Sequence, residues 1–550
     1  MKITDDYLNK PEVFKDKNIV VPTYDVAEMR AETLKNPEWV HFGGGNLYRC
    51  FHAQVAQDLL NSGDLKTGIV VVETFGEDLI DSVYHDFDNR SLTVEMKTDG
   101  SFEKTLVAAT AEALYFHKNN VTDVASLVTI FKAESLQLVT LTITEKGYAV
   151  KDSAGELLAQ VVSDLKVGPE FDQLANTMSK LTYLLLERFN ANQTPLAMVS
   201  TDNFSHNGDR LKAAILEIAQ GWYKAGHVSA DFVAYLSDDT KISFPFSMID
   251  RITPLPNGEI AEQLENSGIE KMKPFVTDKQ KMVLSAFVNT EEVHYLAIED
   301  KFPNGRPALE KASGVLLGNR ETINKADLMK VCTCLNPLHT TLAIFGCLLG
   351  FDRIYKEVED EDLLKLIEQV GFIEGLPVVE NPEIIQPEQF INEVIYKRFA
   401  NPNIPDMPER IATDTSQKIG IRFGETLKAY VAAPDKDVRD LTFIPLTIAA
   451  WCRYLLALDD NGVTFEVSPD PLLPELQAQL STVKLGSENV DLHQILQPIL
   501  RNDLIFGLDL VDIGLADKIE NFFAQLIKET GSVRKVLQAT LATHAKDIQK

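Results

Sequence analysis

Short apolar runs alternate with amphipathic segments in the first half of the chain. The apolar runs cover residues 39–42, 68–73, 138–144 and 196–200, and helical patterns such as 170–191 and 210–221 separate them. Strands that alternate with helices in this way predict a parallel, doubly wound sheet. Residues 91–100 alternate between apolar and polar positions and end in Asp-Gly, so we expect a hairpin that leaves the main sheet there.

From about Lys311 onward the apolar spacing becomes helical. Such patterns cover residues 325–335, 337–349, 361–370 and 441–458. We therefore expect an α/β protein whose residues 1–290 form a Rossmann-like domain with a doubly wound sheet. Residues 291–550 are expected to form a second, mainly α-helical C-terminal domain. The length of 550 residues also favours two domains, because single hydrophobic cores stop growing well below that size.

Charge and composition exclude several classes of protein. A formal net charge of -28 without a basic stripe argues against nucleic-acid binding, and an anionic substrate would need positive charge focused locally. The N-terminus has no apolar core of signal-peptide type, and no uncharged apolar run approaches 18 residues, so we expect no membrane association. Five cysteines, few and odd in number, suit reduced thiols. These features predict a soluble, cytoplasmic protein.

A glycine turn follows the first predicted strand. Trp39-Val-His-Phe42 runs directly into Gly43-Gly-Gly45 and then into an amphipathic segment, which predicts a strand, a turn and a helix. In dinucleotide-binding turns the first glycine permits the bend and the second lets the backbone approach the pyrophosphate at a helix N-terminus. Gly43 and Gly45 occupy those positions, whereas Tyr48 stands at the third. A glycine turn without nucleotide binding is the alternative.

An acidic residue ends the next predicted strand. Glu73 lies 28 residues after Gly45, a little beyond the usual spacing of roughly 20 for the acid that binds the ribose hydroxyls. A carboxylate there would repel a 2′-phosphate, so the expected cofactor is NAD rather than NADP. Asp78 and Asp81 are fallback candidates, and Glu73 as an ordinary exposed acid is the alternative.

Polar groups cluster in an apolar segment further along the chain. Lys330-Val-Cys-Thr-Cys-Leu-Asn336-Pro-Leu-His339 places an amine, an amide and an imidazole in ten residues. Buried polar groups cost free energy unless they are paired or used, so this segment predicts a site within a core helix. Cys332 and Cys334 with His339 would suggest zinc, but Cys-x-Cys with one histidine lacks a closed set of four ligands. We therefore expect no metal.

Several segments together resemble the polyol-specific long-chain dehydrogenase/reductase family, also called the mannitol dehydrogenase family. They keep the family's order and extend over roughly residues 39–425. The matching segments are Gly43-Gly-Gly45-Asn-Leu-Tyr-Arg49, Thr142-Ile-Thr-Glu-Lys-Gly-Tyr148, Ser200-Thr-Asp-Asn-Phe-Ser-His-Asn-Gly208, Phe244-Pro-Phe-Ser-Met-Ile-Asp-Arg-Ile-Thr-Pro254, Ile298-Glu-Asp300 and Arg410-Ile-Ala-Thr-Asp-Thr-Ser-Gln-Lys418.

The resemblance implies a zinc-independent hydride transfer between nicotinamide and a polyol-like chain. The family's catalytic motif is Lys, four residues, Asn, two residues, His; Lys330, Asn336 and His339 match it in type, but five residues separate Lys330 from Asn336. Each residue of an ideal helix turns about 100°, so the extra residue would swing Lys330 off the catalytic face. Because Pro337 breaks the hydrogen-bond ladder back to Thr333, a one-residue bulge there would restore Lys330 to the site.

The resemblance also assigns roles to the catalytic residues. Lys330 would be the base that takes the hydroxyl proton, and for this it must be neutral, which burial favours. Asn336 and Asn203 would donate hydrogen bonds to the reacting oxygen, and His339 would position the substrate hydroxyl. The alternatives are a surface lysine at 330, a helix-capping Asn336 and a core imidazole at His339.

Further residues are carried to the substrate and the cofactor by the same resemblance. Asp250, Arg251, Arg410 and Lys418 would line the substrate pocket, where Arg410 would clamp a carboxylate through two hydrogen bonds. A structural salt bridge is the alternative for Arg251. Glu145 would lie on a proton path from the base, or else in a buried ion pair. The cofactor-binding residues would be Gly43, Gly45, Asn46, Arg49 and Glu73.

The expected activity is NAD-linked interconversion of a sugar acid, D-mannonate and D-fructuronate or the altronate and tagaturonate pair. The first alternative is a hexitol dehydrogenase that interconverts mannitol and fructose, because Arg410 and Lys418 lie in a motif shared by both branches. A second alternative is a regulator that binds nucleotide or sugar without catalysis, supported by the altered spacing between Lys330 and Asn336. A third is a structural zinc-bound interaction protein. The expected partner is a small sugar acid or polyol, and the sequence does not predict the oligomeric state.

Overall fold

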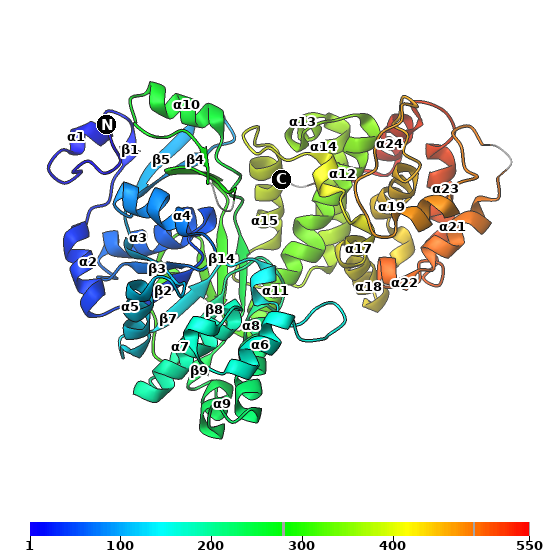
Figure 1. Ribbon diagram of the computed structural model, residues 1–550. Coiled ribbons are helices and arrows are strands. Elements are labelled where there is room, and N and C mark those ends of the chain that lie inside the picture. Colours follow the sequence, from blue (N-terminus) through cyan, green and yellow to red (C-terminus); the bar gives the residue numbers. More distant parts are fainter. Residues whose placement is uncertain (278–280, 488–489, 549–550) are drawn as a thin grey trace. The chain divides into compact units, whose positions relative to one another are not determined.

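The computed structural model describes residues 1–277, 281–487 and 490–548, and it divides into two units (Figure 1). The N-terminal unit comprises Met1–Lys97 and Ser101–Asn324, and the C-terminal unit comprises Thr98–Gly100 and Lys325–Lys550. The boundary at Asn324 replaces the one expected at residue 290. The reason is that β14 (Tyr295–Glu299) pairs antiparallel with β10 (Ser247–Asp250) and parallel with β15 (Val315–Gly318), which ties residues 295–318 to the N-terminal unit.

A six-stranded parallel sheet is the centre of the N-terminal unit. Its order is β6-β3-β2-β7-β8-β9, and every neighbouring pair is parallel. The strands are β2 (Trp39–Phe42), β3 (Ile69–Glu73), β6 (Thr110–Tyr115), β7 (Leu138–Leu141), β8 (Leu196–Ser200) and β9 (Ile242–Ser243). Numbered along the chain, this is the 3-2-1-4-5-6 order of the dinucleotide-binding fold, and the strand order reverses between β2 and β7. The predicted Rossmann-like sheet is confirmed.

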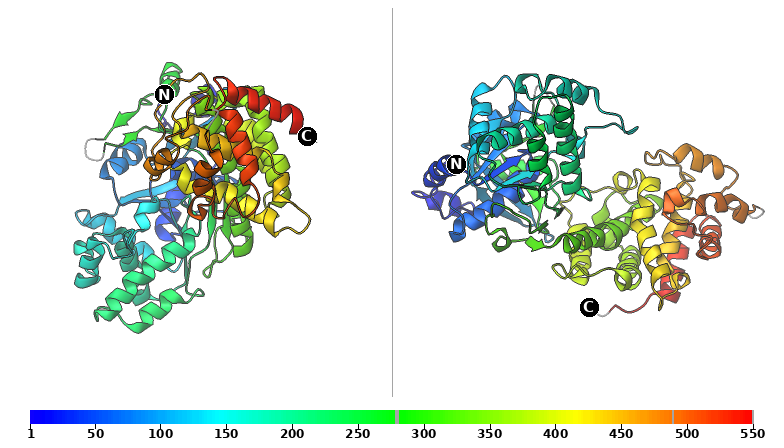
Figure 2. Two further views of the ribbon diagram at one scale, coloured as in Figure 1. Left: turned by 90° about the vertical axis from the view of Figure 1, so that its right-hand side faces the viewer. Right: turned by 90° about the horizontal axis from the view of Figure 1, so that it is seen from below.

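Alternate residues of the strands bury one face of this sheet under helices. Val40 and Phe42 of β2 share a core with side chains of α5 (Val121–Lys132), α7 (Thr177–Ala191) and α8 (Asn207–Lys224). Figure 2 shows the teal helices α7 and α8 gathered on one side of the strands. His41, which points to the opposite face, makes hydrogen bonds to Thr140 at 2.7 Å and to Thr142 at 2.8 Å. The strands are therefore buried on both faces, as their continuous apolar runs predict.

The predicted hairpin is also present outside the main sheet. Strands β4 (Ser91–Met96) and β5 (Phe102–Val107) pair antiparallel, with Met96 opposite Phe102. They join β1 (Ile19–Val20) and β13 (Phe287–Glu291) in a separate four-stranded sheet of order β1-β5-β4-β13. The Asp-Gly turn therefore begins an excursion from the nucleotide-binding sheet, as expected.

Helices make up the C-terminal unit. Its core contains α12 (Asn336–Leu349), which lies against α13 (Ile354–Glu359), α14 (Glu361–Glu368) and α19 (Phe443–Tyr454) (Figure 1). All residues of α19 are buried, and the buried carboxylate of Glu374 accepts hydrogen bonds from the amides of Thr442, Phe443 and Ile444 at its N-terminus. One helical stretch, Arg320–Leu349, is apolar and long enough to cross a membrane, but 83% of its apolar window is buried inside the protein. Such burial is typical of a core helix.

Candidate active site

The glycine turn after β2 packs against the segment that follows β7. Gly43 has a φ of +106°, and a Cβ built there would lie 2.1 Å from the carbonyl oxygen of Thr142, so only glycine fits. A Cβ at Gly45 would meet no atom within 4 Å. Gly45 is exposed and Asn46 is partly exposed. A ligand can therefore approach the backbone of both residues at the point where the strand order of the sheet reverses.

Tyr48, at the third glycine position of the turn, and the next residue, Arg49, are both buried. The Tyr48 ring stacks on His41 with centroids 4.6 Å apart, and its hydroxyl lies 2.9 Å from the hydroxyl of Thr110. Arg49 is 1% exposed, and within the described chain none of its three guanidinium nitrogens has a hydrogen-bond partner. Burial lowers the pKa of Arg49. An unpaired buried cation is costly, so its position beside the turn points to an anionic ligand.

Glu73 contacts the glycine turn directly. One carboxylate oxygen accepts from the amide of Gly44 at 3.1 Å, and the other accepts from the amides of Thr74 and Phe75 at 2.9 and 2.8 Å. The fallback candidate Asp81 instead forms an exposed ion pair with His85 at 3.1 Å. The structure thus places Glu73, at the end of β3, next to the predicted nucleotide-binding backbone.

A buried carboxylate that the sequence analysis did not select lies at the end of β8. Asp202 accepts hydrogen bonds from the amides of Ile143 and Thr144 at 2.9 and 3.0 Å and from the hydroxyl of Tyr148 at 2.6 Å. Thr144 has φ 65° and ψ 159°, a conformation almost restricted to glycine. Asp202 therefore holds the segment after β7 in a strained conformation, and its neighbour Asn203 is exposed.

Glu145 lies on the surface of the N-terminal unit. Its side chain is 61% exposed and pairs with Arg210, whose guanidinium stacks on the Phe204 ring at 5.2 Å. The alternative, a buried ion pair, is correct in that Glu145 forms an ion pair, and wrong in that this pair is exposed. The proton-path role of Glu145 stays a prediction.

Arg251 is committed to contacts inside the N-terminal unit. Its guanidinium donates to the Thr290 hydroxyl at 2.9 Å, to the carbonyl oxygens of Cys50 and Glu291 at 2.9 and 3.3 Å, and to Glu95 at 3.1 Å. The ion pair with Glu95 agrees with the alternative of a structural salt bridge, and the substrate-binding role of Arg251 stays a prediction. Asp250, the last residue of β10, is also buried.

A π-helical turn lies between Lys330 and Asn336. The turn, η7, covers Met329–Cys334, and the amide of Leu335 donates to the carbonyl oxygen of Lys330 at 3.1 Å, five residues back. A π-turn holds one residue more than an α-turn, so it absorbs the additional residue of the motif. The bulge is present as predicted, although it begins before Thr333.

Two of the three motif residues, Lys330 and Asn336, differ from their alternatives. Lys330 is 3% exposed, which rules out a surface lysine. Asn336 is the first residue of α12, and Leu335 rather than Asn336 occupies the capping position. His339 lies one turn later, and its Nε2 is 3.4 Å from a carboxylate oxygen of Asp406.

Asp406 contacts both His339 and Arg410. It is buried, and its other oxygen accepts a hydrogen bond from Arg410 on α16 (Pro408–Ile411). Burial alone would raise the pKa of Asp406, but His339 and Arg410 outweigh it and hold that pKa at about 2. Burial lowers the pKa of His339 despite this carboxylate. The pair is therefore a neutral imidazole held by an ionised carboxylate. Residues 402–408, a segment with three prolines, carry this buried contact.

Two more cations lie near this pair. Lys418, on α17 (Thr415–Ile419), donates to the carbonyl oxygen of Thr413 at 2.7 Å, and burial together with Arg422 lowers its pKa. Arg422, in the π-turn η11 (Gly420–Gly424), donates to the hydroxyl of Thr340, which follows His339. The sequence analysis did not select Arg422, because it lies just beyond the motif that ends at Lys418.

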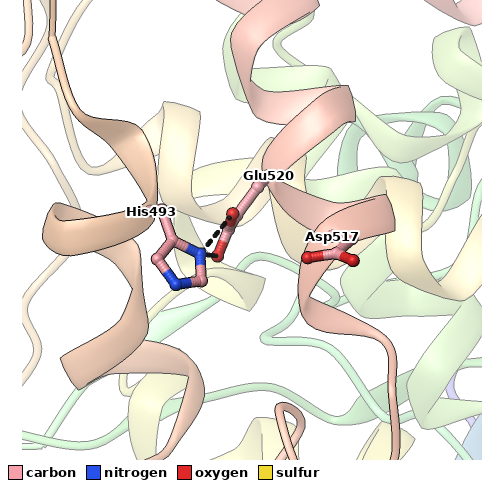
Figure 3. A group of neighbouring side chains, drawn as sticks. All are labelled: His493, Asp517 and Glu520. Carbon is pink, nitrogen blue, oxygen red and sulfur yellow. Dashed lines mark hydrogen bonds and ion pairs between the residues drawn. The ribbon is translucent and has the colours of Figure 1, made fainter.

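The expected absence of a metal stays a prediction. Burial raises the pKa of Cys332 to about 12 and also raises that of Cys334. Within the described ranges, the one group of metal-ligand type is His493, Asp517 and Glu520 (Figure 3). Nδ1 of His493 lies 3.0 and 3.1 Å from the Glu520 oxygens, and Nε2 lies 2.8 Å from the Gln497 amide nitrogen. Both ring nitrogens are engaged by protein groups.

Known proteins resemble this chain in sequence and in fold. Two family models match it, the mannitol dehydrogenase Rossmann domain over residues 37–311 and the mannitol dehydrogenase C-terminal domain over residues 323–526. The D-mannonate oxidoreductase of Thermotoga maritima is 50% identical over 519 residues, which are 94% of this chain and 95% of that protein.

Two solved structures share the fold. The crystal structure of D-sorbitol dehydrogenase in substrate-free form gives a TM-score of 0.77 at 25% identity and covers 94% of this chain and 97% of that one. The ternary complex of Pseudomonas fluorescens mannitol 2-dehydrogenase with NAD and D-mannitol gives 0.68 at 24% identity, and covers 99% and 100%.

Proposed function

Because the chain belongs to the mannitol dehydrogenase family, we propose that it transfers hydride between NAD and a sugar acid, with D-mannonate and D-fructuronate as the substrate pair. The observation that carries this proposal is the buried Lys330, kept in the catalytic helix by a π-turn that absorbs the extra residue of the motif. The choice of mannonate rests on the 50% identity to the Thermotoga maritima enzyme over 94% of the chain.

The nucleotide end has groups that fit NAD. The open backbone at Gly45 and the unpaired guanidinium of Arg49 suit the pyrophosphate, which is anionic. The Glu73 carboxylate beside the amide of Gly44 suits the ribose hydroxyls and would repel the 2′-phosphate of NADP. When bound, the nicotinamide accepts hydride from the substrate carbon or returns it.

The C-terminal unit supplies the proton chemistry. In the oxidative direction Lys330 takes the hydroxyl proton, and in the reductive direction the same ammonium donates it. Asn336 donates a hydrogen bond to the reacting oxygen and does not titrate. His339, held by Asp406, orients a substrate hydroxyl. With an amine base and an amide donor the reaction needs no metal. The role of Asn203 as a second donor remains a prediction.

We also propose a cytoplasmic location, since the five cysteines are free and buried.

Parallel assays with NADH test the proposal. Fructuronate, tagaturonate and fructose are supplied separately, and NADH loss is followed. We expect the highest kcat/KM with fructuronate. Turnover of fructose alone would identify a hexitol dehydrogenase. Tight NADH binding without turnover of any of the three would identify a non-catalytic regulator.

A further inference from the structure

Arg422 is a mostly buried arginine that no carboxylate neutralises in the described part of the chain. Its printed hydrogen bond is to an uncharged group, the hydroxyl of Thr340. A guanidinium has five N–H donors, so this one bond leaves most of its hydrogen-bonding capacity unused. The arrangement is costly for a protein that has no ligand for that charge.

Two other buried arginines of this chain donate to backbone carbonyl oxygens, unlike Arg49, whose guanidinium nitrogens have no partner in the described chain. Arg188 donates to five carbonyl oxygens, those of Thr194, Phe131, Ala133, Leu136 and Pro195. Arg453 donates to the carbonyl oxygens of Leu458 and Asp459. These arginines bind peptide groups and hold loops together. Arg422 lacks such bonds and does not have that structural role.

The acids near Arg422 are engaged by other groups. Arg422 and Arg410 both interact electrostatically with His339 and with Lys418. Asp406 is shared by His339 and Arg410, and Asp414 and Asp470 act on Lys418. Arg422 is therefore the cation of this group that is left for an anionic ligand.

We propose that Arg422 binds the carboxylate of the substrate and thereby selects a sugar acid over an uncharged sugar or polyol. The inference rests on the proposed function, because it assigns the charged end of that substrate. The Thr340 hydroxyl fixes one Nη atom, so that the remaining donors of the planar group present a fork to the two carboxylate oxygens. Arg410 is less suited to this role, because it is 59% exposed and already paired with Asp406.

Arg422 has donors left over after its bond to Thr340, and this also explains discrimination. An uncharged analogue would leave the guanidinium without an anionic partner in the bound complex, and sites built to pair with a polar group reject analogues that lack it. Loss of Arg422 should therefore harm the acid and spare the uncharged substrate. A loss of activity on the acid alone would indicate that Arg422 recognises the carboxylate, whereas a general loss of structure would reduce activity on both substrates.

The test compares two substrates and three variants. Arg422→Gln should lower kcat/KM for fructuronate by roughly 100-fold, the loss expected for charge-assisted hydrogen bonds. Its kcat/KM for fructose should stay within about threefold of the parent, and Arg422→Lys should recover part of the loss for fructuronate. Arg439→Gln is the matched control: Arg439 is 69% exposed, pairs with Asp437, and its loss should change neither substrate. If the parent does not turn over fructose, competitive inhibition by mannonate and mannitol replaces the two substrates.

Thermal melting guards against misfolding. Arg422→Gln should melt close to the parent, because the one side-chain hydrogen bond that Arg422 makes in the described chain is to Thr340, and mannonate should no longer raise its melting temperature in the presence of NADH. Equal activity of parent and Arg422→Gln on fructuronate, or equal losses on both substrates in a folded variant, would overturn the inference and leave the proposed function standing. A parent enzyme that reduces fructose but neither binds nor reduces the acids would instead overturn the proposed function, and the inference with it.

Discussion

The amide of Leu335 donates a hydrogen bond to the carbonyl oxygen of Lys330, five residues earlier, at 3.1 Å. An α-helix would make this bond over four residues. The helix that carries the catalytic motif therefore contains one additional residue at this turn, which has π-helical geometry. Lys330 stays buried, and Asn336 and His339 begin the next helix in regular α geometry.

Removing one residue from the π-turn should be tolerated, whereas adding one should not. Deletion of Val331, which is partly exposed, restores a spacing of four residues and converts the turn to α geometry. We expect kcat/KM within about tenfold of the parent. Insertion of one alanine after Val331 turns Lys330 by about 100° and should lower kcat/KM by at least about 100-fold. An alanine inserted in the exposed turn after Asn461 is the control for insertion as such.

Lys330→Ala should abolish proton transfer without loss of nucleotide binding. General acid–base groups contribute roughly 10²- to 10⁴-fold to turnover, so kcat should fall by that factor. The dissociation constant for NADH, measured by fluorescence, should stay within about twofold. A folded Lys330→Ala variant with unchanged kcat would remove Lys330 from the mechanism.

Local patterns in the sequence predict the elements of this fold well. Val40 and Phe42 mark a buried strand by composition alone, and the Asp-Gly at residue 99 marks the hairpin between β4 and β5. The π-turn at Lys330 also follows from counting, because the motif holds one residue too many and Pro337 cannot donate to Thr333. The resemblance to the mannitol dehydrogenase family is confirmed by the two matching family models.

Contacts between distant segments are what the sequence does not reveal. Asp406 lies among prolines in a stretch that looks like surface, yet it pairs with His339 far back in the chain. Arg251 donates to Thr290 and to Glu95, and no local pattern in the sequence predicts either contact. Periodicity reports which face of an element is buried and carries no information about the partner across the core. The boundary at Asn324 was missed for the same reason, since the pairing of β14 with β10 sets it.

Glu73→Gln should shift the enzyme toward NADPH. The substitution removes the charge that would repel a 2′-phosphate, while the side-chain oxygen can still accept from the amide of Gly44. We expect the ratio of kcat/KM values for NADPH and NADH to rise by about 10- to 100-fold, the effect of removing one like charge at close range. Asp81→Asn is the control, because Asp81 pairs with His85, and it should leave the ratio unchanged. A larger change with Asp81→Asn would move the ribose-binding role to that residue.

Thr144→Gly should stabilise the protein. Thr144 is held at φ 65° by the Asp202 carboxylate, and such a conformation costs a residue with a side chain roughly 1–3 kcal/mol. After the larger backbone entropy of glycine is subtracted, we expect a gain of about 1 kcal/mol in the free energy of unfolding. Chemical denaturation of Thr129→Gly, in the regular helix α5, provides the contrast and should show a loss of about 0.3 kcal/mol.

Asp202→Asn tests the other side of that contact. An asparagine cannot accept from both amides and the Tyr148 hydroxyl at once, so stability should fall by about 1–3 kcal/mol. Combining it with Thr144→Gly should give a smaller loss, because the strained residue no longer needs to be held. Strict additivity of the two changes would show that Asp202 and Thr144 are not coupled.

Glu357→Gln should raise stability at neutral pH and have no effect in acid. Glu357 is 0% exposed, and in the described chain neither of its carboxylate oxygens has a hydrogen-bond partner. It lies against Gly346, where a Cβ would come within 2.1 Å of its Oε1. Burial, followed by the charges of Glu409 and Asp360, raises the pKa of Glu357 well above 4.5.

The sign of the pH effect follows from the proton balance. The unfolded chain releases the Glu357 proton near pH 4.5, whereas the folded protein keeps it to higher pH. Stability is therefore lost as the pH rises above 4.5, until the folded group also ionises, and below 4.5 the two states are equally protonated. Glutamine cannot ionise and escapes this loss, so denaturation at pH 7 should show a gain of about 1–3 kcal/mol that disappears near pH 4. Glu388→Gln, at an exposed position of α15 (Pro387–Glu393), should show no such difference. A gain that persists at pH 4 would mean that packing against Gly346, rather than the proton, sets the cost.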